Sequence, residues 1–144
     1  GGVARTRYFA KEMNCSLAII DKRRDKHNEA IAAHVIGDVE GKTCIMFDDI
    51  IDTAGTICEA AKLLKKEGAK DIYVCAAHPV FSGPAYERIA ESALEEVIVA
   101  DTIPLNSDPA KDKSKITVLS MTDMFADIIN KVYNYEEISS SFIN

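Results

Sequence analysis

The sequence has 144 residues, which fits one domain, and carries 23 acidic against 17 basic side chains, a net charge of −6 at pH 7. A hydrophobic fraction of 47% excludes a disordered chain. The acidic balance argues against a dedicated nucleic-acid or membrane-surface protein, but it allows a local basic pocket for phosphorylated small molecules.

The first third of the chain predicts one helix, short strands and a basic loop. Residues 3–13 have the apolar spacing of a short amphipathic helix, and 17–20 form an apolar run typical of a buried strand. The polar segment 21–29 is interpreted as a loop. Residues 32–36 and 43–47 flank a glycine-containing segment and predict two strands joined by a turn.

The rest of the chain alternates helices with strands. The strongest helix prediction is 56–67, in which Thr56 and Glu59 fit a capping box and Gly68 is a natural stop. The elements after it are a strand at 72–77, a helix at 83–92, a strand at 97–100, a surface loop at 101–115, a strand at 116–119 and a last helix. That last helix has an apolar stripe interpreted as facing the core, formed by Met121, Met124, Phe125, Ile128, Ile129 and Val132.

The alternation of strands and helices indicates the fold class. The strands from residue 43 onward are nearly continuous apolar runs, which favours an α/β fold with a largely parallel sheet flanked by helices on both faces. Ligands of such sheets bind beyond the carboxyl ends of the strands, so we expect the chemistry there.

The cysteines and apolar runs bear on the compartment. Cys15, Cys44, Cys58 and Cys75 show neither C-x-x-C spacing nor an accompanying histidine cluster, which argues against a zinc site. We interpret them as small buried side chains in a reducing, cytoplasmic environment. No apolar run approaches the ~20 residues that span a bilayer, so no membrane partner is expected.

The run from Cys44 to Thr56 carries the predicted chemistry. A helix N-terminus offers free N–H groups and a positive dipole end to a phosphate, small residues allow close approach, and threonines add hydroxyl donors. Two carboxylates at a strand end can accept hydrogen bonds from a sugar diol. We therefore predict a ligand shaped like ribose 5-phosphate, bound by Asp48, Asp49, Asp52, Thr53, Ala54, Gly55 and Thr56.

Residues 48–56, DDIIDTAGT, resemble the motif that binds phosphoribosyl diphosphate in type I phosphoribosyltransferases and ribose-phosphate pyrophosphokinases. Three other segments resemble the pyrophosphokinases in particular: 19–24 their catalytic flexible loop, 35–42 the hairpin after it, and 78–85 the segment after the next strand. The opening GGVAR resembles the sequence just after their magnesium-binding aspartate. The resemblance covers nearly the whole chain and implies a single phosphoribosyltransferase-like, Rossmann-like domain.

This resemblance implies Mg²⁺-dependent transfer of diphosphate from ATP to the C1 hydroxyl of ribose 5-phosphate, giving phosphoribosyl diphosphate and AMP. It implies Lys22 and Arg24 as catalytic cations, because cations stabilise charge that develops during phosphoryl transfer. A solvated charge run is the alternative for this segment. Asp48 and Asp49 are candidates for contacts with either Mg²⁺ or ribose hydroxyls. The expected assembly is a homo-oligomer, hexameric in family members, with ADP and inorganic phosphate as candidate regulators.

Parts of the family pattern have no counterpart in these 144 residues. The family's N-terminal domain, which holds much of the ATP site, is missing, and so is the strand that carries the magnesium-binding aspartate. We therefore interpret the chain as a C-terminal fragment that lacks its first strand, and we expect it to make no phosphoribosyl diphosphate alone.

Two other functions stay open. A nucleobase phosphoribosyltransferase would share the 48–56 motif, but it needs a base-recognition hood that is not legible in this sequence. A non-catalytic regulatory paralogue of the synthase should show a damaged sugar-phosphate loop or basic loop, and both look intact. A second α/β domain upstream, ending in an aspartate shortly before Gly1, would decide for the pyrophosphokinase.

Overall fold

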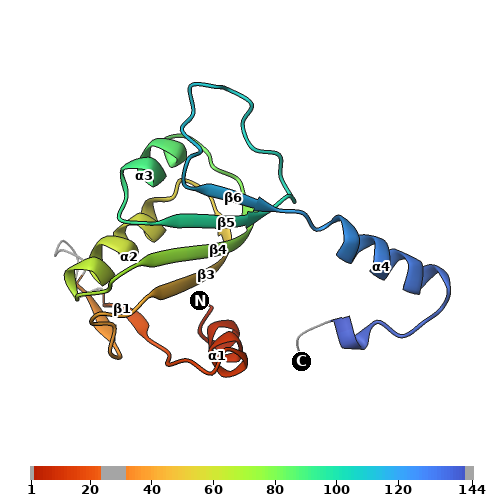
Figure 1. Cartoon of the computed structure of the whole chain (residues 1–144), viewed down its shortest axis with the longest axis horizontal. Helices are drawn as coiled ribbons and strands as arrows, with labels where there is room; N and C mark the ends of the chain where they lie inside the picture. Colours follow the sequence, from red (N-terminus) through yellow and green to blue (C-terminus); the bar gives the residue numbers. More distant parts are fainter. Residues whose placement is uncertain (1, 24–31, 142–144) are drawn as a thin grey trace.

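The structure is a computed structural model that describes residues 2–23 and 32–141 (Figure 1). Its elements follow in chain order: α1 (Val3–Glu12), β1 (Ile19–Arg23), β2 (Ala32–Ile36), β3 (Cys44–Ile51), α2 (Gly55–Lys66), β4 (Ile72–Pro79), α3 (Ala85–Glu91), β5 (Glu96–Ala100), β6 (Ile116–Leu119), α4 (Thr122–Tyr133) and the 3₁₀ turn η1 (Ser139–Ser141). Strands alternate with helices from β3 to β5, as the sequence predicts, and β5 leads to β6 through the predicted loop.

A four-stranded parallel sheet in the order β3-β4-β5-β6 forms the centre of the molecule. Met46, Val74, Val97 and Ile116 lie side by side across it as register partners. Apolar and β-branched residues of this kind are typical of a sheet buried on both faces. The predicted α/β fold with a parallel sheet is confirmed. Within the described residues β3 has a neighbour on one side only, so it is an edge strand.

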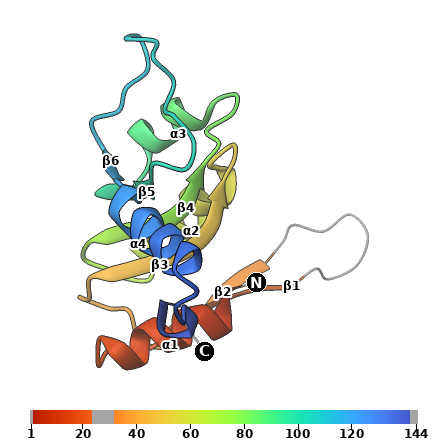
Figure 2. The ribbon, with the colours of Figure 1, turned by 90° about the vertical axis from the view of Figure 1, so that its right-hand side faces the viewer.

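Helices cover both faces of this sheet. On one face, α2 buries Ile57, Ala61 and Leu64 in the same core as Ile72 and Val74, both fully buried. α1 packs on the opposite face, and Figures 1 and 2 show it apart from α2 and α3. Phe9 of α1 stacks on Phe47 of β3 with ring centroids 4.4 Å apart. Since successive strand residues point to opposite faces, Met46 and Phe47 belong to the two different layers.

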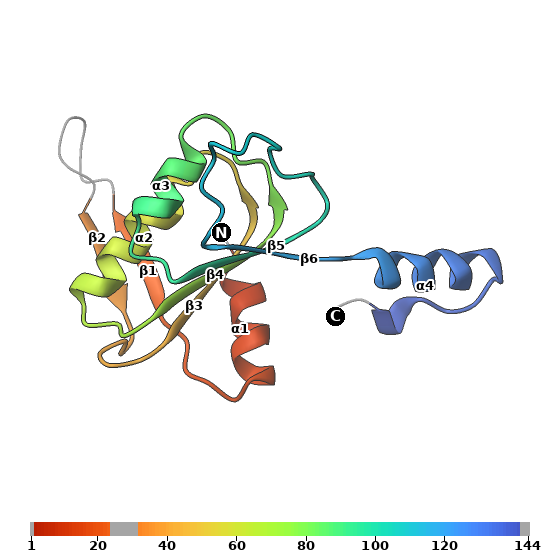
Figure 3. The same ribbon diagram turned by 45° about the horizontal axis from the view of Figure 1, so that its top comes forward.

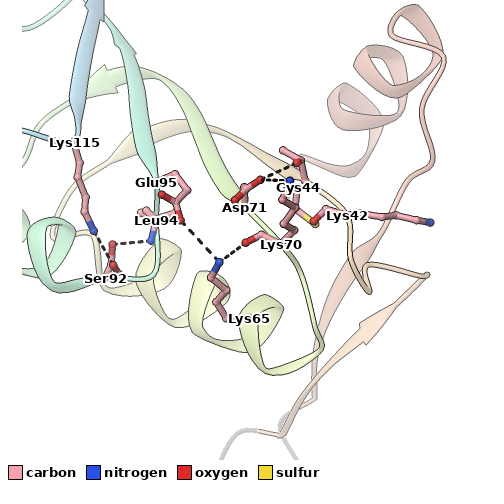
Figure 4. Close-up of polar contacts among 10 residues, drawn as sticks. Lys42, Cys44, Lys65, Lys70, Asp71, Ser92, Leu94, Glu95 and Lys115 are labelled. Atoms are coloured by element: carbon pink, nitrogen blue, oxygen red, sulfur yellow. Dashed lines mark hydrogen bonds and ion pairs between the residues drawn. The ribbon is translucent and has the colours of Figure 1, made fainter.

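The amino ends of the strands are joined by polar contacts (Figure 4). The ammonium group of Lys65, near the end of α2, donates to the carbonyl oxygen of Lys70 and lies 3.9 Å from a Glu95 carboxylate oxygen. Lys115, just before β6, donates to the carbonyl oxygen of Ser92 over 2.8 Å. These contacts fix the loops at the edge of the sheet that lies opposite the predicted site.

The two strands predicted at 32–36 and 43–47 are present, but they do not pair with each other. β2 pairs antiparallel with β1, Ile36 opposite Ile19, and the two form a separate sheet, whereas β3 pairs with β4. Local turn residues do not reveal that β2 pairs with the earlier strand β1, or that β3 pairs with the later strand β4. β1 also extends to Arg23, so the first residues of the predicted loop are strand, and Arg24 lies outside the described residues.

The prediction that the last helix faces the core is also wrong. α4 projects away from the sheet (Figure 3) and contains no buried residue. Phe125 is 51% exposed and Ile129 is 66% exposed. The apolar spacing shows that one face of α4 is suited to a partner, but among the described residues no element covers it.

The cysteines are free thiols, and the prediction that all are buried fails for Cys15, which is exposed. Cys44, Cys58 and Cys75 are partly buried, and this burial raises the pKa of each thiol. In residues 2–23 and 32–141, no helix has the length and apolar character that crossing a membrane requires.

Candidate functional site

The two carboxylates of the predicted site lie inside β3 rather than just beyond its end. The strand was expected to stop at residue 47, but it continues to Ile51 because Ile50 and Ile51 extend the β-branched pattern. Asp48 pairs in register with Ala76, so it shares the face covered by α2. Asp49 points to the face of α1. Both aspartates are exposed and therefore accessible from opposite sides of the strand.

The local electrostatics keep Asp49 ionised. Its backbone N–H donates to Asp48 Oδ1 over 2.9 Å, and Arg5 Nη1 of α1 lies 3.8 Å from Asp49 Oδ1. The pKa of Asp49 is lowered, first by the Asp49 backbone N–H, then by hydrogen bonding with Asp48 and by the charge of Arg5. Asp49 therefore offers acceptor oxygens at neutral pH.

Residues 52–56 form the turn after β3 and the first two residues of α2, and they are called the anion loop because the sequence predicts that they bind a phosphate. The predicted capping box is wrong, because the helix begins at Gly55 and Thr56 lies inside its first turn. The N-cap is Ala54, with a positive φ of 59°, and it makes no side-chain cap hydrogen bond. The methyl side chain of Ala54 cannot accept hydrogen bonds from the free N–H groups in the first turn of α2, so these donors are left for another acceptor. The hydroxyl-bearing residues Thr53 and Thr56 are exposed beside them.

The segment that joins β4 to α3 holds the anion loop in place. The backbone N–H groups of Phe81 and Ser82 donate to the carbonyl oxygens of Ile51 and Asp52, each over 3.1 Å. The Ser82 hydroxyl donates to Asp52 Oδ1, so this carboxylate helps to fix the loop.

A second contact comes from helix α3. Arg88 Nη1 donates to the carbonyl oxygen of Thr53 over 2.9 Å. Sequence reasoning missed Ser82 and Arg88. The resemblance of residues 78–85 marked the neighbourhood of Ser82, whereas no local pattern marked Arg88.

His78 lies near the carboxyl end of β4, opposite Ile50 of β3. Its Nδ1 is 2.9 Å from the Thr102 hydroxyl, which donates to the carbonyl oxygen of Ala77 over 2.8 Å. The Thr102 hydroxyl therefore accepts a hydrogen bond from Nδ1–H of His78. The charge of His78 also contributes to the lowered pKa of Asp49.

The basic residues of the prediction fall at the limit of the described residues or beyond it. The backbone of Lys22 lies in β1, paired with Ala33, and Arg24 falls outside the described residues. Ile20 of β1 and Leu64, in the last turns of α2, line one cavity of about 680 Å³ beneath α1. None of the predicted site residues lines this cavity. The catalytic roles of Lys22 and Arg24 stay predictions.

The described part of the chain contains no group of three or more histidine, cysteine, aspartate or glutamate side chains that could hold a metal ion. Asp48 and Asp49 provide two carboxylates. Mg²⁺ in phosphate-transfer sites is commonly held by one or two carboxylates together with water and substrate phosphates. Because Asp48 and Asp49 point to opposite faces of β3, a magnesium ion shared with a phosphorylated substrate can take one of these carboxylates as a ligand, but not both.

Comparison with known proteins gives a consistent result. Residues 10–143 match the family model described as phosphoribosyl synthetase-associated domain. The chain is 50% identical over 143 residues to a ribose-phosphate pyrophosphokinase of Wolinella succinogenes, covering 99% of this chain and 45% of that protein. It is 51% identical over 145 residues to one of Synechococcus elongatus, covering 99% of this chain and 43% of that protein.

A solved structure agrees with these relatives. The phosphoribosylpyrophosphate synthetase from Mycobacterium smegmatis superimposes with a TM-score of 0.84 and 41% sequence identity, covering 93% of this chain and 42% of that one. The chain thus spans less than half the length of the curated relatives and of the solved structure.

Proposed function

Because the chain belongs to the ribose-phosphate pyrophosphokinase family, we propose that it is the part that binds ribose 5-phosphate in an enzyme making phosphoribosyl diphosphate. The reaction is transfer of the terminal diphosphate of ATP to the C1 hydroxyl of ribose 5-phosphate, which releases AMP. In this proposal, polypeptide outside the 144 residues supplies much of the ATP site. The active form is a homo-oligomer, with ADP or inorganic phosphate as regulators.

The observation that carries this proposal is the anion loop with its uncapped helix. The N-cap residue Ala54 makes no side-chain cap hydrogen bond to the N–H donors in the first turn of α2, and the positive end of the helix dipole lies at the same place. Thr53 and Thr56 bring two hydroxyl donors to this point. A phosphate monoester satisfies all of these donors at once, and the 5-phosphate of the sugar is the group assigned to them.

The strand geometry suggests different roles for Asp48 and Asp49. Asp48 shares a face with α2, so we assign it to the hydroxyls of a ribose whose phosphate occupies the anion loop. Asp49 points to the other face, where Arg5 Nη1 lies 3.8 Å from Asp49 Oδ1, and we assign its carboxylate to Mg²⁺. The metal would neutralise charge on the triphosphate of ATP. Lys22 and Arg24 are proposed to stabilise the charge that develops on the transferring diphosphate.

Steady-state kinetics of the full-length enzyme test this division. Lys22→Ala should lower kcat by about 10²–10³, with little change in the KM for ribose 5-phosphate, because its interaction is made mainly in the transition state. Thr53→Ala should mainly raise that KM, since it removes a donor to the bound phosphate. Each variant is the other's control. The assignment fails if Lys22→Ala changes only KM or Thr53→Ala leaves KM unchanged.

Calorimetry on the 144-residue chain tests the binding step separately. Ribose 5-phosphate should bind, and ribose without the phosphate should not bind measurably under the same conditions. The purified chain should form no AMP from ATP and ribose 5-phosphate. Binding of ribose and ribose 5-phosphate with equal affinity would contradict the assignment of the anion loop to the phosphate.

A further inference from the structure

Arg88 links α3 to the anion loop across 35 positions of sequence, through the 2.9 Å hydrogen bond from Nη1 to the Thr53 carbonyl oxygen. Its side chain is exposed, and within the described residues it forms no ion pair with a carboxylate. The guanidinium charge is thus uncompensated beside the loop. It adds to the positive potential at the N-terminus of α2.

The guanidinium group also lies against the first residue of α2. A Cβ atom at Gly55 would come within 3.3 Å of Arg88 Nη1, which is closer than ordinary van der Waals contact. The missing side chain at Gly55 therefore leaves room for the cation as well as for an incoming anion. This placement brings the charge to the end of the helix where the free N–H donors are.

The hydrogen bond to Thr53 fixes the orientation of one peptide unit. In a planar trans peptide the C=O and the following N–H point in opposite directions, so anchoring the Thr53 carbonyl directs the Ala54 N–H away from Arg88. Ala54 needs such an anchor, because its φ of 59° is unfavourable for a residue other than glycine. Arg88 therefore holds the loop in the conformation that presents its donors.

We propose that Arg88 is a positioning residue of the phosphate site, holding the anion loop through the Thr53 carbonyl and adding a positive charge beside it. The ligand class is a phosphate monoester, and the inference rests on the proposed binding of ribose 5-phosphate at residues 52–56. Arg88 acts through the loop and needs no direct contact with the substrate.

Calorimetry on the 144-residue chain with ribose 5-phosphate tests this role. Arg88→Ala should raise Kd about tenfold, near the lower end for a charge-assisted hydrogen bond because the side chain is exposed. Arg88→Lys keeps the charge and one donor, so it should recover part of the affinity. Arg88→Gln lacks the charge and should bind more weakly than Arg88→Lys, with a smaller dependence on salt concentration. Lys66→Ala, an equal charge change in the last turn of α2, should leave Kd unchanged.

The outcomes separate this inference from the proposed function. If the unaltered chain binds ribose 5-phosphate and Arg88→Ala binds it equally well, the inference is overturned and the proposed function stands. If the unaltered chain does not bind, both fall. Should Arg88→Ala fail to fold, the Lys and Gln variants decide: Kd values equal to that of the unaltered chain would overturn the inference. A better affinity for Lys than for Gln supports it.

Discussion

Gly37 and Gly41 form a matched pair for testing how closely the end of β2 packs against the residues that precede β1. Gly37 follows β2 with a φ of 114°, and a Cβ there would lie 3.0 Å from the Leu17 carbonyl oxygen and 3.1 Å from Ala18 Cα. These are backbone atoms and cannot turn aside as a flexible side chain would. Gly41 has a φ of 66°, but its Cβ would meet no atom within 4 Å. Alanine at the two positions therefore separates crowding from backbone strain.

The expected cost can be worked out for each substitution. Gly37→Ala adds about 1–3 kcal/mol of backbone strain and about 1–3 kcal/mol of overpacking, less about 0.4–1 kcal/mol from reduced freedom of the unfolded chain. The net loss of unfolding free energy is about 3 kcal/mol. Gly41→Ala has only the left-handed backbone strain of about 1–2 kcal/mol, with the same offset, so its net loss is about 1 kcal/mol.

Urea denaturation of the two variants measures this difference, and hydrogen exchange of the β1 and β2 amides shows whether the loss is local to the hairpin. The reasoning is refuted if both variants lose the same unfolding free energy and show the same exchange in β1 and β2. It is supported if Gly37→Ala loses about 2 kcal/mol more, or if its hairpin amides exchange selectively faster.

Two further predictions concern stability. Leu94→Ala should cost about 2–5 kcal/mol, because Leu94 is 1% exposed in the core, whereas Ile129→Ala, at a 66% exposed position of α4, should change stability by less than about 0.5 kcal/mol in thermal unfolding. Equal losses would mean that the face of α4 is covered. The backbone N–H of Met121 and the hydroxyl of Ser120 lower the pKa of Asp101 below 3.8, so its contribution is present above the unfolded-state pKa and is lost as pH falls through the folded-state pKa. Asp101→Asn should therefore flatten the dependence of Tm on pH below about pH 4, and an unchanged slope would contradict the assignment.

The sequence predicted those features of the fold that depend on local pattern. The period of α2 and the apolar runs of β4, β5 and β6 gave the alternation and the parallel sheet, since both follow from burial of a face. Features that depend on distant parts of the chain were not predictable in this way. The pairing of β2 with β1 and the exposed face of α4 depend on which partner is available.

In the candidate site, too, local features were predictable from the sequence and long-range contacts were not. The 48–56 run predicted a passage from a strand into a helix, and the structure has this turn between Ile51 and Gly55, but apolar residues after Asp49 lengthened β3 and turned the two aspartates to opposite faces. Helix α2 begins at Gly55, one residue before Thr56. Its N-cap is Ala54, whose positive φ no capping rule anticipates. Arg88 reaches Thr53 only through the packing of α3, so its role became visible only in three dimensions.

The free edge of β3 has a consequence for how the isolated chain behaves in solution. An edge strand with unpaired backbone groups is a template for pairing with another strand, and natural proteins usually protect such edges with charge, proline or a covering segment. Ile45 is 43% exposed and Ile50 is 49% exposed along this strand, so two apolar side chains accompany the open backbone. Aspartates 48 and 49 between them act as the charged gatekeepers of this edge. The carboxylates assigned to the ribose and to Mg²⁺ thus also oppose aggregation, and neutralising them would reduce solubility together with binding.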